Sequence, residues 1–83
     1  MKISLKMRIY AALFKLMDGR KKYTFNELTD LLNDNKFYLN KNCEHLGQAL
    51  SALMISGIIC HDYNSNKDNC WKITTLCKLM RAK

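Results

Sequence analysis

The residues best suited to covalent chemistry stand together at positions 60–62, where Cys60, His61 and Asp62 follow one another directly. A thiol, an imidazole and a carboxylate are the groups that many nucleophilic active sites combine. The pattern around them predicts a β-strand, in which neighbouring side chains point to opposite faces. His61 would then face away from both Cys60 and Asp62 and could not relay a proton between them. Because the sequence also lacks a glycine-rich phosphate loop or another catalytic motif, we expect that the protein is not an enzyme.

The sequence holds four cysteines, at positions 43, 60, 70 and 77. A zinc site needs closely spaced ligand pairs such as Cys-x-x-Cys, and the cysteines contain no such pair. Cys60 and Cys70 fall on the two arms of a predicted hairpin, which leaves a cross-strand disulfide or half of a metal site open beside simple packing. Since no export signal is recognisable, we expect a cytoplasmic protein with reduced, mostly buried thiols, without metal or cofactor.

The balance of charges favours a polyanionic partner, because 14 Lys and Arg stand against seven Asp and Glu in a chain of 83 residues. The formal charge of +7 makes nucleic acid and anionic membrane the first candidates. The longest apolar stretch, 53–60, is far shorter than the about 20 residues that a membrane-spanning helix requires. The chain length of 83 residues predicts a single domain over residues 1–83, without a separate substrate domain. We therefore expect a nucleic-acid partner, and neither a membrane nor a small-molecule substrate.

Apolar spacing predicts a first helix over residues 5–17, which ends where Gly19 can adopt the left-handed conformation. A second apolar stripe beside its core stripe is typical either of a central helix covered on two sides or of a dimer surface. More apolar side chains lie in a short final helix that Thr74 or Thr75 would cap. We predict a homodimer whose interface consists of Met7, Tyr10, Phe14, Met17, Leu76, Leu79 and Met80.

A basic connector over residues 20–22 leads through a brief strand at 22–24 into a second helix, which runs to about residue 32. Thr24 is the expected N-cap, and Glu27, three residues later, can complete a capping box. Tyr23 and Leu28 occupy the two positions of a hydrophobic staple. The start of this helix is therefore specified locally.

A third helix is predicted to begin near Asn40 or Asn42 and to reach Ser56, just before Gly57. Its core stripe consists of Cys43, Leu46, Ala49, Leu50, Leu53 and Met54. The opposite side of the helical wheel collects Lys41, Glu44, His45, Gln48, Ser51 and Ala52. Alternation over 58–63 and 70–74, on either side of the turn-rich segment 64–69, then predicts a β-hairpin.

This succession of elements resembles the winged helix-turn-helix family. The resemblance rests on Leu50-x-x-Leu53-x-x-x-Gly57-Ile58-Ile59, followed by Trp71-x-Ile73-Thr74, and covers the chain from about residue 5 to 80. It implies an α+β fold with a three-helix core, a C-terminal hairpin as the wing and a short terminal helix. It also implies sequence-specific binding of double-stranded DNA by a small transcriptional regulator, with the third helix in the major groove.

Groove geometry then gives each polar residue a role, because the major groove admits one α-helix. The residues expected to contact base edges are Lys41, Glu44, His45, Gln48 and Ser51. The residues expected to bind phosphates, without reading sequence, are Arg20, Lys21, Lys22 and Lys67.

Three other interpretations compete with this one. The polar face of the third helix can be merely its solvated side. The domain can instead dock a protein without sequence-specific DNA binding, which Ile55 on that face supports slightly. RNA binding through Tyr38, Tyr63 and Trp71 is the weakest of the three, because Trp71 is expected to pack inward.

Overall fold

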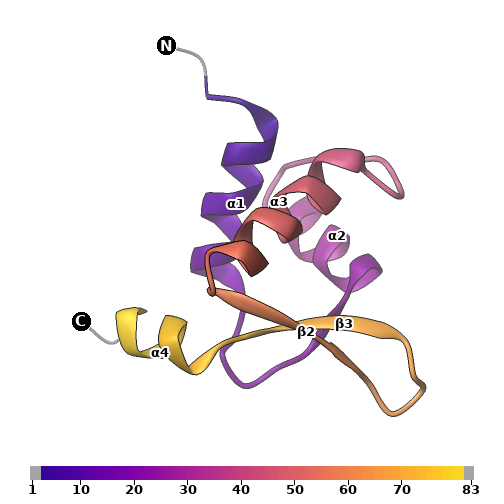
Figure 1. Cartoon of the computed structure of the whole chain (residues 1–83). Coiled ribbons are helices and arrows are strands. Elements are labelled where there is room, and N and C mark those ends of the chain that lie inside the picture. Colours follow the sequence, from indigo (N-terminus) through magenta and orange to yellow (C-terminus); the bar gives the residue numbers. More distant parts are fainter. Residues whose placement is uncertain (1–2, 82–83) are drawn as a thin grey trace.

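The computed structural model describes residues 3–81, which form an α+β fold measuring 33 × 33 × 22 Å (Figure 1). In chain order the elements are α1 (Leu5–Leu16), β1 (Tyr23–Thr24), α2 (Phe25–Asp34), α3 (Glu44–Ile55), β2 (Ile59–Tyr63), β3 (Asn69–Ile73) and α4 (Thr75–Arg81). Helices α1, α2 and α3 lie on one side of the small sheet, and α4 follows β3 at the end away from the hairpin turn (Figure 1). Within residues 3–81, no helix is long and apolar enough to cross a membrane.

Helix α1 begins at Ser4, whose hydroxyl oxygen accepts a hydrogen bond of 3.3 Å from the backbone N–H of Met7. The expected left-handed residue at Gly19 is wrong, since Gly57 is the glycine with a positive φ. Helix α1 instead ends because Met17 turns to extended backbone, with φ −66° and ψ 126°. The carboxylate of Asp18 then accepts from the backbone N–H of Arg20 at 2.9 Å and stabilises this corner, so that Gly19 does not need a left-handed conformation.

The capping box at the start of α2 is confirmed in both directions. The Thr24 hydroxyl accepts from the Glu27 backbone N–H at 3.2 Å, and the Glu27 carboxylate accepts from the Thr24 backbone N–H at 3.0 Å. Tyr23 and Leu28 are both buried, as the staple requires. The brief strand before the helix is also confirmed, and the helix continues two residues beyond the predicted end.

Helix α3 begins at Glu44, later than the predicted start at Asn40 or Asn42. Asn42 has a φ of +60°, which no residue of a right-handed helix adopts, so the helix cannot form before it. Cys43 becomes the N-cap and makes no side-chain capping bond. Lys41 therefore lies in the turn before α3 and not on the helix.

The three strands form an antiparallel sheet in the order β1-β3-β2, which confirms the predicted hairpin to within one residue at each strand start. His61 lies opposite Trp71, and Cys60 lies opposite Lys72. Directly opposed residues share a face and successive residues alternate. His61 and Trp71 therefore belong to one face of the sheet, and Cys60 and Lys72 belong to the other.

The hydrophobic core lies between α1, α2, α3 and one face of the sheet, which we call the inner face. Its buried members are Ile9, Leu13, Met17, Tyr23, Leu28, Leu32, Leu46, Ala49, Leu50, Leu53, Ile58, Ile59, Ile73 and Cys77. The sheet's inner face is the face of Ile59, Trp71 and Ile73, and its outer face is that of Cys60 and Lys72.

Three residues depart from their predicted burial. Met17 is 0% exposed and packs in the core, so its assignment to a dimer surface is wrong. Met54, predicted for the core stripe of α3, is 36% exposed, and Cys43 is only half-buried because it precedes the helix. The burial of Met17 shows that the chain itself covers this part of the apolar stripe at the end of α1.

Candidate nucleic-acid interface

Four of the five predicted base-contacting residues lie together on the exposed side of α3. Glu44, His45, Gln48 and Ser51 are all exposed. The Gln48 amide nitrogen donates to the Glu44 carboxylate at 3.2 Å, a bond between side chains one helical turn apart. The fifth residue, Lys41, is exposed in the preceding turn. The structure therefore presents a row of hydrogen-bonding groups along one helix.

A shallow hollow of about 590 Å³, which we call the α3 hollow, opens beside this row. Helix α3 and the turn before it line one side, through Cys43, Glu44 and Gln48 among others, and Phe25 at the start of α2 lines the other. A Cβ added at Gly47, also in the lining, would meet no atom within 4 Å. The surface of α3 is therefore sterically open at this point.

A row of rings continues from the α3 hollow across the inner face of the sheet. Phe25 meets Trp71 edge to face with ring centroids 6.3 Å apart, Trp71 meets His61 at 5.7 Å, and His61 meets Tyr63 at 4.9 Å. A hydrogen bond of 2.8 Å joins His61 Nε2 to Asn69 Oδ1 on the neighbouring strand. Sequence reasoning missed this row; the signal that could have found part of it is strand alternation, which puts His61 and Tyr63 on one face.

Two aromatic residues of this row, Trp71 and Tyr63, differ in exposure. Trp71 is half-buried against the core, as predicted. Its ring nitrogen Nε1 is buried and has no partner within the described part of the chain. Tyr63 is 57% exposed. The row therefore runs from a partly buried end near α2 to an exposed end near the hairpin turn.

The predicted phosphate-contacting residues do not share this surface. Arg20, Lys21 and Lys22 line a second hollow, the outer hollow, together with Lys72 of the sheet's outer face. No residue of α3 belongs to its lining. Lys67 stands apart from them in the hairpin turn, exposed and with a φ of +64°. The fold thus separates the connector cations from the side chains of α3 that were predicted to contact base edges.

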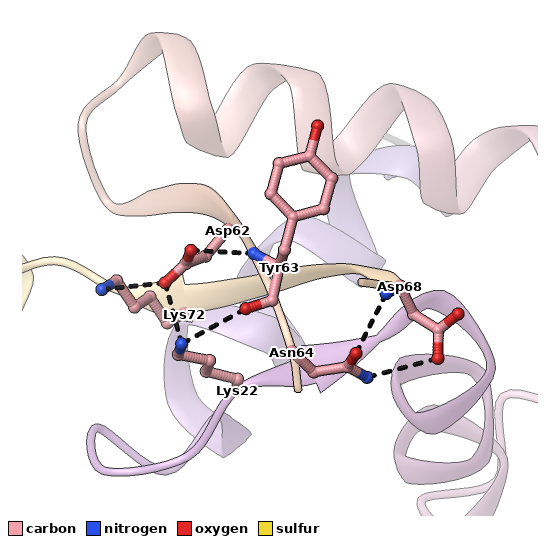
Figure 2. A network of polar contacts seen from close by, with 6 residues as sticks. All are labelled: Lys22, Asp62, Tyr63, Asn64, Asp68 and Lys72. Atoms are coloured by element: carbon pink, nitrogen blue, oxygen red, sulfur yellow. Dashed lines mark hydrogen bonds and ion pairs between the residues drawn. The ribbon is translucent and has the colours of Figure 1, made fainter. Parts of the chain in front are cut away.

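Lys22 is further committed to an ion pair. Its ammonium lies 3.0 Å from Asp62 Oδ2, which the ammonium of Lys72 also approaches to 3.2 Å (Figure 2). The other carboxylate oxygen, Oδ1, accepts from the Tyr63 backbone N–H at 2.8 Å. This backbone bond and the two lysines hold the pKa of Asp62 far below its usual value, and Asp62 in turn raises the pKa of Lys22. Asp62 and Lys22 are therefore both charged at neutral pH.

The four cysteines are free thiols. Cys60 lies opposite Lys72 while Cys70 lies opposite Asp62, so the two cysteines are diagonal neighbours on the outer face and are not directly paired. Cys70 is buried, and this burial raises the pKa of its thiol. Within residues 3–81, no three side chains of His, Cys, Asp or Glu form a group that could hold a metal ion.

Two surfaces of different chemistry thus lie on the two faces of the sheet. One combines the exposed side of α3 with the row of rings, and the other gathers cations around the outer hollow. Comparisons of the chain with models of protein families, with curated proteins and with solved structures find no match.

Proposed function

We propose that the protein is a winged-helix DNA-binding protein that inserts α3 into the major groove of double-stranded DNA. The observation that carries the proposal is the exposed polar side of α3, open at Gly47, on a chain with a formal charge of +7. The element order, with a β-hairpin directly after α3, agrees with the resemblance to winged helix-turn-helix proteins. We further propose that it acts as a transcriptional regulator.

Base contacts follow from the side chains that α3 exposes. Gln48 can pair bidentately with an adenine, giving up its bond to Glu44. Glu44, once released, can accept from a cytosine amino group. His45 and Ser51 provide adaptable contacts on the same side of the helix. Because exchange of one hydrogen bond for another changes the free energy little, the Gln48–Glu44 bond is no obstacle to binding.

We assign the phosphate contacts to cations that lie near α3 and the hairpin and do not line the outer hollow. Lys41 precedes α3, and Lys67 lies in the hairpin turn, and both are exposed. We propose that these two lysines set the position of α3 in the groove without reading sequence. The connector cations line a hollow on the other face of the sheet and are not assigned to this duplex.

We also propose a homodimer, with an interface revised by the burial of Met17. Met7 on α1 is 58% exposed, and the α4 residues Leu76, Leu79 and Met80 are 55%, 64% and 51% exposed. Tyr10 and Phe14 are half-buried and pack against the core, so they can contribute only their outer edges. A twofold dimer would place two copies of α3 about 34 Å apart, on successive major grooves. A dimeric mass by light scattering at tens of micromolar is the expected result.

The decisive experiment replaces Gln48 with alanine and measures binding to a preferred duplex selected from random sequence. Gln48→Ala should relax the preference at one base pair and cost about 1–3 kcal/mol, or about 5- to 150-fold in Kd. Binding to unrelated duplexes should change little, because phosphates supply that affinity. The control is Lys15→Ala on α1, an exposed side chain outside both hollows, which should keep the sequence preference.

The competing function is a protein-docking module, favoured by Ile55, which is 89% exposed at the end of α3. The salt dependence of duplex binding separates the two functions. Several phosphate contacts require a steep fall of affinity with salt. Weak binding without a salt slope, or a preferred sequence unaffected by Gln48→Ala, would refute DNA reading by α3.

A further inference from the structure

The outer hollow, on the outer face of the sheet, has a volume of about 390 Å³. Three separate parts of the chain supply its cations: the connector after α1, strand β3 and helix α4. These cations are Arg20, Lys21, Lys22, Lys72 and Lys78. Its lining includes no carboxylate, and the half-buried thiol of Cys60 belongs to it. Cations that are distant in sequence thus converge around one concavity.

Nearby carboxylates neutralise only part of this charge. Asp62 is shared between Lys22 and Lys72, so one negative charge serves two ammonium groups (Figure 2). Arg20 pairs with Asp18 at 3.6 Å, and Lys21 pairs with Glu27 at 4.0 Å. Both pairs are exposed to solvent and contribute little to stability. Five cations against three carboxylates leave an excess of two positive charges around the hollow.

Lys78 is the cation that no carboxylate approaches within the described part of the chain. Its side chain passes directly over Gly19, where an added Cβ would lie 3.2 Å from Lys78 Cε. Glycine at this corner therefore serves close packing and not a left-handed turn. The absence of a side chain at Gly19 lets Lys78 reach across the connector into the lining of the outer hollow.

We infer that the outer hollow binds a small ligand that carries linked phosphate groups, at a site independent of the DNA-binding side of α3. Its volume falls in the range of small-molecule sites, about 300–1,000 Å³. Lysines and arginine are the usual partners of phosphate oxygens. A ligand with several linked charges can engage Arg20 and Lys21 of the connector together with Lys78 of α4. Asp62 meanwhile keeps its pairs with Lys22 and Lys72. No residue of α3 lines this hollow, so a duplex read by α3 is not expected to occupy it.

The chain holds its own reporters for the test, because each of the two hollows is lined by one half-buried cysteine. Cys60 lines the outer hollow and Cys43 lines the α3 hollow. Cys70 and Cys77 are buried and should react slowly. The full chain is treated with a maleimide, and mass spectrometry of peptides gives the modification rate at each cysteine. The probe is inorganic tripolyphosphate, compared with sodium chloride at the same ionic strength.

Tripolyphosphate should slow the modification of Cys60 and leave that of Cys43 unchanged. Lys78→Met, which removes an exposed charge without breaking an ion pair of the described residues, should raise the tripolyphosphate concentration needed for protection roughly tenfold. Lys15→Met removes the same charge outside both hollows and should have no such effect.

Several results would overturn this assignment. Unchanged modification of Cys60, equal protection of Cys43 and Cys60, or equal protection by sodium chloride would each exclude a specific site. Protection of Cys60 by a DNA duplex but not by tripolyphosphate would identify a nucleic-acid backbone as the occupant instead. The DNA-binding proposal is judged by protection of Cys43 with a short duplex, so the two proposals can fail separately.

Discussion

The corner between β3 and α4 offers the sharpest test of what holds this fold together. The Thr74 hydroxyl donates to the carbonyl oxygen of Gly57 at 2.6 Å, at the point where α3 gives way to β2. The hydroxyl oxygen of Thr74 in turn accepts from the backbone N–H of Cys77 at 3.1 Å and so caps α4. One hydroxyl group therefore ties the end of α3 to the start of α4. Thr74→Val removes this group and keeps the shape of the side chain.

The magnitude follows from the loss of the cap and of the donated hydroxyl bond, which the Ile58 carbonyl oxygen at 3.1 Å shares with that of Gly57. An N-cap contributes about 1 kcal/mol, with a range of roughly 0.5–2 kcal/mol. A carbonyl left without its donor in a half-buried position costs about 1–2 kcal/mol more. We therefore expect Thr74→Val to lower the free energy of unfolding by about 2–3 kcal/mol. For a domain of this length, that corresponds to a fall in Tm of about 10–20 °C.

Urea unfolding followed by circular dichroism measures the effect, and two controls make it specific. Thr74→Ser keeps the hydroxyl and should cost less than about 1 kcal/mol. Thr75→Val makes the same chemical change at the next residue, which is exposed and has no side-chain hydrogen bond within the described chain. The reasoning is refuted if Thr74→Val unfolds like the unchanged protein, or if Thr74→Ser is as unstable as Thr74→Val.

Three further predictions use other contacts. In urea unfolding, Met17→Ala should cost about 2–5 kcal/mol because Met17 is fully buried, whereas Met7→Ala should stay within about 0.5 kcal/mol. Since the folded state lowers the pKa of Asp62, its ionised form stabilises the fold above about pH 4, and this contribution disappears as the pH falls; Asp62→Asn should flatten that pH dependence of the urea midpoint. Gly57→Ala should cost about 1–2 kcal/mol through its φ of +77° alone, because the added Cβ meets Leu76 at an ordinary 3.7 Å; a larger loss in urea unfolding would indicate a clash.

Sequence reasoning succeeded where structure is determined by neighbours along the chain. The capping box of Thr24 and Glu27 needs only four consecutive residues, and both of its hydrogen bonds are present. The hairpin likewise follows from alternation on either side of a polar turn. In that turn the Asn64 side chain accepts from the backbone N–H groups of Asn66 and Asp68, both at 2.9 Å. Local hydrogen bonding therefore suffices to define these elements.

Sequence reasoning failed where distant segments cover one another. The stripe that contains Met17 looks like a surface for a second copy of the chain when α1 is considered alone. In the fold, Arg81 at the end of α4 donates to the Met17 carbonyl oxygen at 2.8 Å, across 64 residues of sequence. Cys77 of α4 belongs to the same core cluster. Helical periodicity identifies an apolar side but not the element that covers it.

The loop before α3 was unpredictable for a different reason. Lys36, Tyr38 and Asn42 all have a positive φ, although none is glycine. The Asn33 side chain helps to fix this path, because its oxygen accepts from the Leu39 backbone N–H at 2.6 Å. Propensity scales favour other conformations for such residues, so sequence reasoning extended α3 too far back. This is why Lys41 was expected on the helix and lies in the turn before it.

Strand alternation decides how the two proposed sites share one small sheet. Because neighbouring side chains of a strand point to opposite faces, His61 cannot relay a proton between Cys60 and Asp62. The same alternation assigns His61 to one surface and the other two residues to the opposite one. His61 joins the row of rings beside α3, whereas Cys60 lines the outer hollow and Asp62 binds its lysines. Because side chains on opposite faces do not touch, substitutions in the outer hollow can alter phosphate binding without moving the residues of α3. Communication between the sites would then have to pass through the backbone of the sheet, which the buried Ile59 and Ile73 hold against the helices.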